Sequence, residues 1–341
     1  MWKMGWTRRE VLKKGTGTLA AVAGSGLVRA QARPFDLGQI VITWYPIFLY
    51  HLPVTVAREL GELERRGIRI REIVGARGGG ETVRTLVAGN LLMGEAAVGA
   101  AVRSVWKSRD PYVIVGGGVK SPSDVFWIVP RNSPIRSIAD LAGRRVGYTT
   151  PGSVTEQVLI LSLQKAGVPI DSVRLVAAGG IGEGLALLAR GELDSAAMLP
   201  SAFTRPEDFR ILFSARDFLP DYFQTVILAH RRLLETNPGV VRSFLAARRW
   251  GVRRIRERPE EAIEIYARSA NISLELARES FRIAGVAEGL YYSEGGFTPE
   301  GLRLAEEGLR ISREIGPEER VPWRQIVDQR FLDADLRVTL P

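Results

Sequence analysis

Short runs of β-branched and other apolar residues alternate along the chain with segments whose apolar residues recur every three or four positions. The first kind of run predicts buried strands, and the second predicts helices with one face packed on a core. In the first part of the chain we expect strands over Ile40–Trp44, Ile68–Val74, Ala96–Gly99 and Tyr112–Val115, and helices over His51–Arg66, Glu81–Ala88 and Ala101–Lys107. Strands that alternate with helices are typical of parallel α/β units.

The same alternation starts again after Pro130. Strands are expected over Arg145–Tyr148, Val173–Ala177 and Ser195–Met198, and helices over Ile138–Leu141, Val154–Ala166 and Gly184–Arg190. The chain therefore has the pattern of two α/β lobes, each with its own sheet. Two short apolar segments, Val125–Val129 and Thr225–Ala229, flank the second set and are predicted to be hinge strands that cross between the lobes.

After Arg232 the sequence is mostly helical in pattern and rich in arginine and glutamate. Spaced apolar residues and charged faces predict helices over Pro238–Arg256, Glu260–Ser269, Leu274–Gly285 and Pro299–Ile315. We expect these helices to pack back on the first lobe. The predicted division is an N-terminal segment over residues 1–32, the first lobe over 33–127, the second lobe over 128–227, and a return to the first lobe over 228–341.

The N-terminal segment has the three parts of a secretory signal. Thr7–Lys13 matches the twin-arginine export pattern, a short apolar run follows over Leu19–Val28, and Ala30-Gln31-Ala32 is a small-x-small cleavage site. The alternative is a membrane anchor, but the apolar run is too short to span a bilayer. We therefore predict export by the twin-arginine route to the periplasm, cleavage after Ala32, and no membrane span in the mature chain.

Composition removes several classes of chemistry. The chain has no cysteine and only two histidines, His51 and His230, so thiol nucleophiles, disulfides and histidine-rich metal sites are excluded. The net charge is +9, but residues 1–32 hold six basic residues and one acidic residue, which leaves a mildly basic mature chain. No basic run is interleaved with aromatic residues, so nucleic-acid binding is not indicated. We expect a monomer without cofactor or metal.

One turn is the most informative candidate site. Gly152-Ser153-Val154-Thr155 follows a predicted strand and opens a predicted helix. A helix that begins in this way presents free backbone N–H groups and two hydroxyls at its positive end, which suits a small anion. The alternative is an ordinary helix cap, because serine and threonine cap helices widely. From these residues alone both interpretations stay open.

Other candidate ligand-binding residues lie where predicted strands end. Gly180 belongs to a glycine-rich turn, Gly179–Gly184, whose spacing differs from a dinucleotide fingerprint and favours close approach of the backbone to a cleft. Gly80 ends a glycine run that lacks the phosphate-loop lysine. Trp44 and Tyr45 could enclose a ligand or pack on the core rim, and Lys120 and Ser121 could bind a ligand or be solvated.

Catalytic groupings are sparse. The sequence has no G-x-S-x-G nucleophile elbow. His51 and His230 lie near a helix start and a predicted hinge strand, and the structural interpretation is favoured for both. The sequence therefore predicts a protein that is not an enzyme and has no catalytic residue.

Several motifs in a fixed order resemble a known family. They are Ile138–Gly147, Pro151-Gly152-Ser153, Ala189–Ala196 and Pro200, with Leu86–Gly89, Asn237-Pro238 and Val327–Phe331 around them. Their order and spacing resemble the nitrate/sulfonate/taurine branch of ABC-importer solute-binding proteins. That group also includes thiamine-pyrimidine-binding and pyrimidine-synthase-like proteins. The resemblance covers essentially all of the mature chain.

The resemblance implies a periplasmic-binding-protein-like fold, in which two α/β lobes close on a ligand and deliver it to a permease driven by an ATPase. Gly152, Ser153 and Thr155 fall on the family's anion-contacting turn. Trp44 and Tyr45 fall on its first-strand ligand loop. The resemblance also places Gly80, Gly99 and Pro200 at strand ends that face the cleft.

Three functions are compatible with these patterns. The leading hypothesis is an exported solute-binding protein for a small organic anion, such as a sulfonate, a carboxylate or nitrate, or for a small aromatic or heterocyclic compound. The first alternative is an enzyme on the same fold, such as a hydrolase or a pyrimidine synthase, and the second is a ligand sensor for a membrane receptor. Recovery of an intact ligand and the identity of neighbouring genes would discriminate among them.

Overall fold

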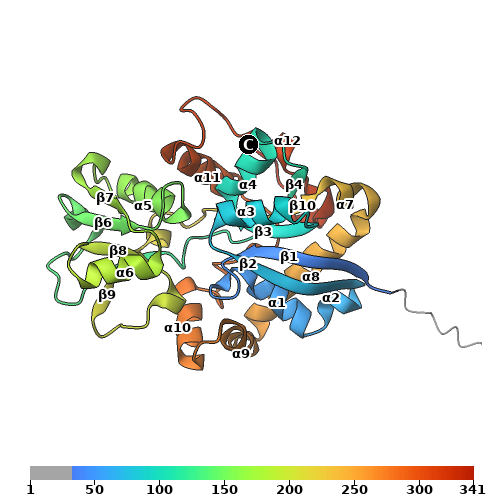
Figure 1. Cartoon of the computed structure of the whole chain (residues 1–341), viewed down its shortest axis with the longest axis horizontal. Helices are drawn as coiled ribbons and strands as arrows, with labels where there is room; N and C mark the ends of the chain where they lie inside the picture. Colours follow the sequence, from blue (N-terminus) through green and yellow to red (C-terminus); the bar gives the residue numbers. More distant parts are fainter. Residues whose placement is uncertain (1–32) are drawn as a thin grey trace, which may run out of the picture. The chain divides into compact units, whose positions relative to one another are not determined.

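The computed structural model describes residues 33–341, so the predicted export signal over residues 1–32 lies outside the described residues. One sheet contains β1 (Phe35–Thr43), β2 (Ile68–Ala76), β3 (Met93–Ala97), β4 (Tyr112–Gly117) and β10 (Thr225–His230). The other contains β5 (Phe126–Pro130), β6 (Arg145–Tyr148), β7 (Arg174–Ala177), β8 (Ser195–Met198) and β9 (Phe209–Ser214). The strand orders are β2-β1-β3-β10-β4 and β7-β6-β8-β5-β9 (Figure 1). The predicted α/β class with two sheets is confirmed.

Helices connect and flank these strands. In the first half of the chain they are α1 (Leu52–Glu59), α2 (Glu62–Arg65), α3 (Gly79–Ala88), α4 (Val98–Val102), α5 (Val154–Lys165) and α6 (Ile181–Ala189). In the second half they are α7 (Arg231–Thr236), α8 (Pro238–Glu257), α9 (Pro259–Ala270), α10 (Leu274–Ala284), α11 (Pro299–Ile311) and α12 (Trp323–Ile326). The single helix expected over His51–Arg66 is two helices, because Gly61 adopts a left-handed conformation with φ 75° between them.

The two sheets share one topology that the sequence did not fully predict. In the first sheet β1 pairs in parallel with β2 and β3, and in the second β6 pairs in parallel with β7 and β8. β10 and β5, however, run antiparallel to both of their neighbours. The expectation of parallel units therefore holds for three strands of each sheet, and one inserted antiparallel strand completes it.

The segments predicted to cross between the lobes are located differently. β5 lies inside the second sheet and β10 inside the first, each between two other strands. The chain passes from one sheet to the other in the residues just before them, 118–125 and 215–224. Their apolar character reflects burial on both faces of a sheet, which sequence alone does not distinguish from a buried crossing.

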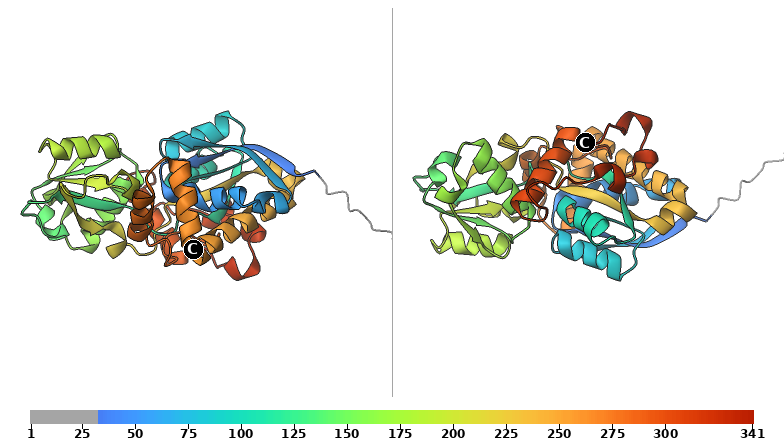
Figure 2. Two further views of the ribbon diagram at one scale, coloured as in Figure 1. Left: turned by 90° about the horizontal axis from the view of Figure 1, so that it is seen from below. Right: turned by 90° about the horizontal axis from the view of Figure 1, so that it is seen from above.

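The C-terminal helices contact both sets of elements. α8 packs on α1 in the first lobe, as expected, but α11 packs on α5 and α10 packs on the segment Pro200–Ala202 (Figure 2). The expectation that this region packs on the first lobe alone was therefore incomplete. Within residues 33–341, no helix is long and apolar enough to cross a membrane.

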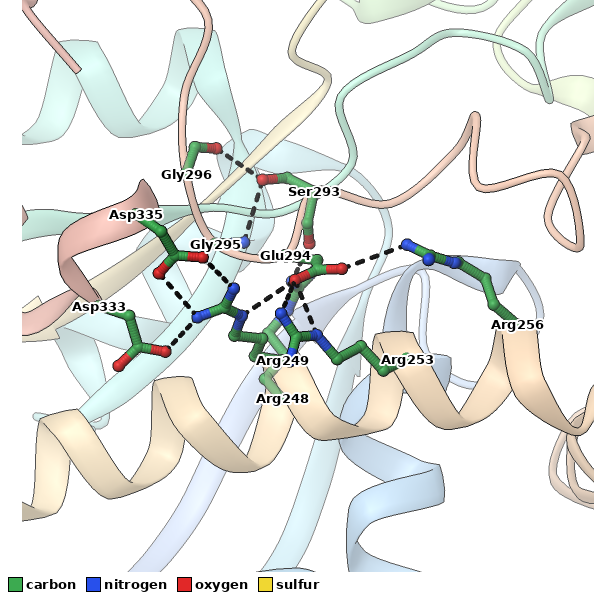
Figure 3. A network of polar contacts seen from close by, with 10 residues as sticks. All are labelled: Arg248, Arg249, Arg253, Arg256, Ser293, Glu294, Gly295, Gly296, Asp333 and Asp335. Atoms are coloured by element: carbon green, nitrogen blue, oxygen red, sulfur yellow. Dashed lines mark hydrogen bonds and ion pairs between the residues drawn. The ribbon is translucent and has the colours of Figure 1, made fainter. Parts of the chain in front are cut away.

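A cluster of ion pairs attaches the C-terminal segment to α8. Arg249 donates Nε–H to Glu294 at 2.9 Å and also pairs with Asp333 and Asp335 (Figure 3). Arg253 and Arg256 reach the same Glu294 carboxylate from the following turns of α8, at 2.9 and 3.2 Å. These contacts hold the pKa of Glu294 below its ordinary value against the opposing effect of burial.

A second charge pair is fully buried. Arg248 of α8 is 1% exposed and Glu95 of β3 is 3% exposed, and Nε of the arginine lies 3.3 Å from the carboxylate. The Thr225 hydroxyl donates to the other carboxylate oxygen at 2.6 Å, and Arg248 also donates to the Ser293 carbonyl at 2.9 Å. The pair therefore joins β3, β10 and α8 in the interior of the first lobe.

Candidate functional site

A cavity of about 720 Å³ is lined by residues of both lobes. From the first lobe it receives the loop after β1, the turn between β2 and α3, and the start of α4. From the second lobe it receives the turns that precede α5 and α6. Its size is in the range that encloses a small organic molecule.

Three helices begin at this cavity, and each carries a glutamate in its first turn. Gly79, Gly152 and Gly180 lie at or just before the starts of α3, α5 and α6, and all three line the cavity. The Glu81 carboxylate accepts a hydrogen bond from the Arg77 amide at 2.8 Å, and Glu156 accepts one from the Gly152 amide at 2.6 Å. Glu183 occupies the corresponding position in α6. The positive helix ends therefore attract an anion, but part of this attraction is already used by the chain's own carboxylates.

The turn before α5 combines the two interpretations that the sequence left open. Ser153 is the helix cap, because its hydroxyl accepts a hydrogen bond from the Glu156 amide at 3.2 Å. The Thr155 hydroxyl accepts from the Thr149 amide at 3.0 Å and lies 2.9 Å from the Ser153 hydroxyl. Gly152, Ser153 and Thr155 nevertheless all line the cavity. Their hydroxyls hold the turn together while its backbone faces the cavity.

An acidic residue from a distant segment lies against this turn. Glu314 follows α11, lines the cavity, and forms an ion pair with Arg103, which follows α4 and also lines it. A Cβ atom built on Gly152 would lie only 2.9 Å from a Glu314 carboxylate oxygen, and Gly152 has a positive φ of 76°. Glycine at this position thus permits both the turn conformation and the close approach of Glu314.

Two arginines that the sequence analysis did not single out provide positive charge. Arg77 and Arg84 line the cavity at the start of α3 and both are exposed. Within residues 33–341, neither is among the arginines that form ion pairs, in contrast to Arg103. The signal in the sequence was the glycine run beside Arg77, which predicts a turn but does not indicate where the guanidinium points.

The opposite wall of the cavity is aromatic. Trp44 lines it as predicted, and Phe48 and Tyr50, from the same loop, were not anticipated. The Trp44 and Phe48 rings meet edge to face with centroids 5.4 Å apart. This loop is held from the second lobe and from α9, because the Ile47 carbonyl accepts hydrogen bonds from Ser201 at 3.1 Å and from Tyr266 at 2.9 Å.

The structure brings together seven of the predicted residues. Those that line the cavity are Trp44, Gly80, Gly99, Gly152, Ser153, Thr155 and Gly180. The other four candidates lie outside the lining: Tyr45 packs edge to face on His51, Lys120 follows the main chain of Tyr291, Ser121 is buried, and Pro200 is buried beneath the cavity wall. Each lies beside a lining residue, but its side chain or backbone is used for packing.

Neither histidine lines the cavity. His51 is buried at the start of α1, where its ring nitrogens contact Thr55 Oγ1 at 2.7 Å and the Pro46 carbonyl at 3.0 Å. Burial lowers the pKa of His51 to about 4. His230 accepts from the Arg232 amide at the start of α7. Within the described part of the chain, no group of acidic and histidine side chains is placed to hold a metal ion.

A buried carboxyl lies directly behind the cavity. Asp124 accepts hydrogen bonds from Gln224 at 2.7 Å and from Tyr291 at 2.8 Å. Burial raises the pKa of Asp124 to about 6, although these hydrogen bonds oppose the rise. His51 and Asp124 therefore titrate over the same range of pH with opposite effects on stability.

We expect the two residues to show this opposition in variants. Below about pH 6.5 the unfolded chain binds a proton at His51 that the folded chain refuses until about pH 4, so His51 removes stability as pH falls. Asp124 binds a proton in the folded state first and adds stability from about pH 6 to 4. Between pH 7 and 4, urea unfolding should therefore shift in favour of His51→Gln and against Asp124→Asn, each by up to about 3 kcal/mol relative to wild type. Shifts of the same sign would contradict the assignment.

Comparison with known proteins follows from this geometry. A family model described as NMT1/THI5 like matches residues 49–262. The chain belongs to the NMT1/THI5-like family. The resemblance identified from the sequence motifs is thereby confirmed for the family, and the matched segment of this NMT1/THI5-like chain includes every predicted site residue except Trp44 and Tyr45. A search of curated proteins found no match.

Solved structures share the fold of this NMT1/THI5-like chain. The periplasmic aliphatic sulphonate-binding protein SsuA from Escherichia coli superposes with a TM-score of 0.68 at 20% identity, covering 87% of this chain and 92% of that chain. The alkanesulfonate-binding protein SsuA from Xanthomonas axonopodis pv. citri, bound to MOPS, has the same score at 18% identity, with coverages of 87% and 99%. The DSZB desulfurization enzyme, in complex with biphenyl-2-sulfinic acid, reaches 0.65 at 17% identity, with 86% and 97%. Binding proteins and an enzyme thus share this fold, and residues of the cavity must distinguish them.

Proposed function

We propose that the chain is an exported solute-binding protein of an ABC importer, which captures a small organic acid with an apolar or aromatic body and delivers it to a permease. The observation that carries this proposal is the cavity between the two sheets. It has two arginines without an ion-pair partner in the described chain, Arg77 and Arg84, and an aromatic wall at Trp44, Phe48 and Tyr50. The family and the fold support a solute-binding role.

The charges of the cavity favour an acid. Arg77 and Arg84 present guanidinium groups that bind carboxylate or sulfonate oxygens in a bidentate manner. The starts of α3, α5 and α6 add aligned backbone dipoles around the same space. The acid group would lie beside the arginines, and the apolar body would lie against Trp44 and Phe48.

Ligand capture would proceed by closure. A molecule that contacts both lobes stabilises the arrangement in which both walls touch it, and the residues 118–125 and 215–224 would take up the rotation. The absence of cysteine from the whole chain and the location of both histidines away from the cavity support binding rather than a desulfinase-like reaction. Export through the twin-arginine signal and the division at residues 32, 127 and 227 remain predictions.

The proposal is tested first by identifying what the protein carries. Native mass spectrometry of protein purified from its own host should show a bound compound that is recovered intact. A thermal-shift screen of sulfonates, carboxylates, nitrate and pyrimidines should then show stabilisation by organic acids. Conversion of the recovered compound into a product by the purified protein would instead support an enzyme.

We expect Arg84→Gln to weaken the binding of benzenesulfonate by about tenfold, because a charge-assisted hydrogen bond contributes about 1.5–3 kcal/mol. Titration calorimetry measures this change. Arg69→Gln is the matched control, since Arg69 is an exposed arginine of β2 that does not line the cavity. Equal affinity of the two variants would remove Arg84 from the site.

A further inference from the structure

Three deeply buried polar residues line the cavity at what we call its floor: Thr43, Tyr50 and Gln224. Their exposed fractions are 3%, 6% and 1%. Thr225 also lines the cavity, but its hydroxyl is already engaged, since it donates to Glu95 and accepts from the Val119 amide at 2.8 Å. Only the floor residues have hydrogen-bonding capacity left for a ligand.

The side-chain amide of Gln224 has a fixed orientation. Its Nε2 atom donates to Asp124 Oδ1 at 2.7 Å and to the Ser121 carbonyl at 2.9 Å. A carbonyl and an ionised carboxylate only accept hydrogen bonds, so both amide hydrogens are committed to them. The Oε1 atom must therefore face the other way, and its neighbour there is the Tyr50 hydroxyl at 3.4 Å, a long contact for a hydrogen bond.

Asp124 is itself held in place. Its second carboxylate oxygen accepts a hydrogen bond from Tyr291 at 2.8 Å, and the residue is 1% exposed. Asp124 and Gln224 come from the two different segments that pass between the sheets. The main chain of Gln224 is bound as well, by the Val119 carbonyl and the Val98 amide, both at 2.9 Å. The orientation of the amide is thus set from both sides.

Thr43 provides an independent observation. Within the described part of the chain its Oγ1 atom has no hydrogen-bond partner, although the residue is buried at the end of β1. Buried polar atoms in folded proteins are nearly always paired, so an unpaired one beside a cavity marks a place for an atom of a ligand or a water.

We propose that the cavity floor selects ligands that carry a hydrogen-bond donor, such as an amino group, at the end remote from the acid group. Asp124 is a positioning residue in this selection, because it turns the Gln224 carbonyl oxygen toward the ligand. The inference rests on the proposed function, which places the acid group at Arg77 and Arg84. It adds a requirement at the opposite end of the ligand.

A pair of probes of nearly equal size tests this requirement. 4-Aminobenzenesulfonate and 4-methylbenzenesulfonate differ in one group, which is a donor in the first and apolar in the second. Titration calorimetry of the wild-type protein should show about fivefold tighter binding of the amino probe, the factor that one net hydrogen bond supplies. Equal affinities, or tighter binding of the methyl probe, would overturn the inference and leave the proposed function intact. Failure of every organic acid to bind would overturn the proposed function instead.

Variants separate the floor from the acid-binding end. Gln224→Met should bring the affinity ratio of the two probes close to one, and Asp124→Asn should reduce the ratio because the amide is no longer held by an obligate acceptor. Thr43→Val, an isosteric change, should lower the ratio without lowering the melting temperature. Arg84→Gln is the matched control, because it should weaken both probes equally and leave their ratio unchanged. A ratio unaffected by Gln224→Met and Thr43→Val would contradict the assignment of the floor.

Discussion

Arg248→Met is expected to lower the free energy of unfolding by about 3–5 kcal/mol, because it leaves the Glu95 carboxylate buried without its counter-ion. The two charges are 1% and 3% exposed and lie 3.3 Å apart. Water cannot replace the guanidinium at this depth. Chemical denaturation measured by circular dichroism gives the loss directly.

Two further variants make this result specific. Arg253→Met removes an arginine one turn farther along α8, where it is 49% exposed and pairs with Glu294, so we expect a loss below about 1 kcal/mol. The double variant Arg248→Met with Glu95→Gln removes both charges and should recover a large part of the stability, because the desolvation cost disappears with the charge. A double variant as unstable as Arg248→Met alone would show that packing, rather than the unpaired charge, dominates.

Glu314→Gln is expected to tighten the binding of benzenesulfonate by about tenfold. The Glu314 carboxylate lies against Gly152, lines the cavity and neutralises Arg103. Removing its charge ends the repulsion of an incoming acid and releases Arg103 to attract it. Two unit charges about 6 Å apart interact by roughly 2–3 kcal/mol at an effective dielectric constant near 20, so a tenfold change is the expected order.

The sign of this effect distinguishes two roles for Glu314. Arg103→Gln should act in the opposite direction and weaken binding, since it leaves Glu314 unpaired at the cavity. Glu318→Gln is the matched control, because Glu318 is an exposed residue on the same segment that does not line the cavity. Weaker binding in Glu314→Gln, measured by calorimetry at low salt, would mean that this carboxylate contacts a positive group of the ligand.

The sequence predicted the fold more completely than it predicted the site. Local alternation located the parallel strands β1, β2 and β6, because the period of apolar residues depends only on residues close in sequence. It did not predict that β5 and β10 run antiparallel, since a strand buried on both faces has the same apolar pattern in either direction. The break between α1 and α2 depended on one glycine inside an otherwise helical pattern.

The candidate site shows the same division. Gly152, Ser153 and Thr155 could be predicted because a strand, a turn and a helix start follow one another directly in the chain. The residues that give the cavity its charge could not: Glu314 reaches the turn from beyond α11, and Arg84 is one of many arginines. Nothing in the local sequence of an arginine distinguishes a guanidinium that faces a cavity from one that faces solvent.

By itself, the sequence determined the α/β class, the repetition of the pattern in two lobes, the absence of thiol chemistry and the turn before α5. These properties depend on composition and on neighbouring residues. Only the tertiary structure decided that the turn is capped by its own side chains, that Glu314 and Arg103 meet there, and that Asp124 orients Gln224. Those properties depend on distances between groups from separate elements, and electrostatic and hydrogen-bond energies change over a few ångströms. Folding, and not proximity along the chain, sets those distances.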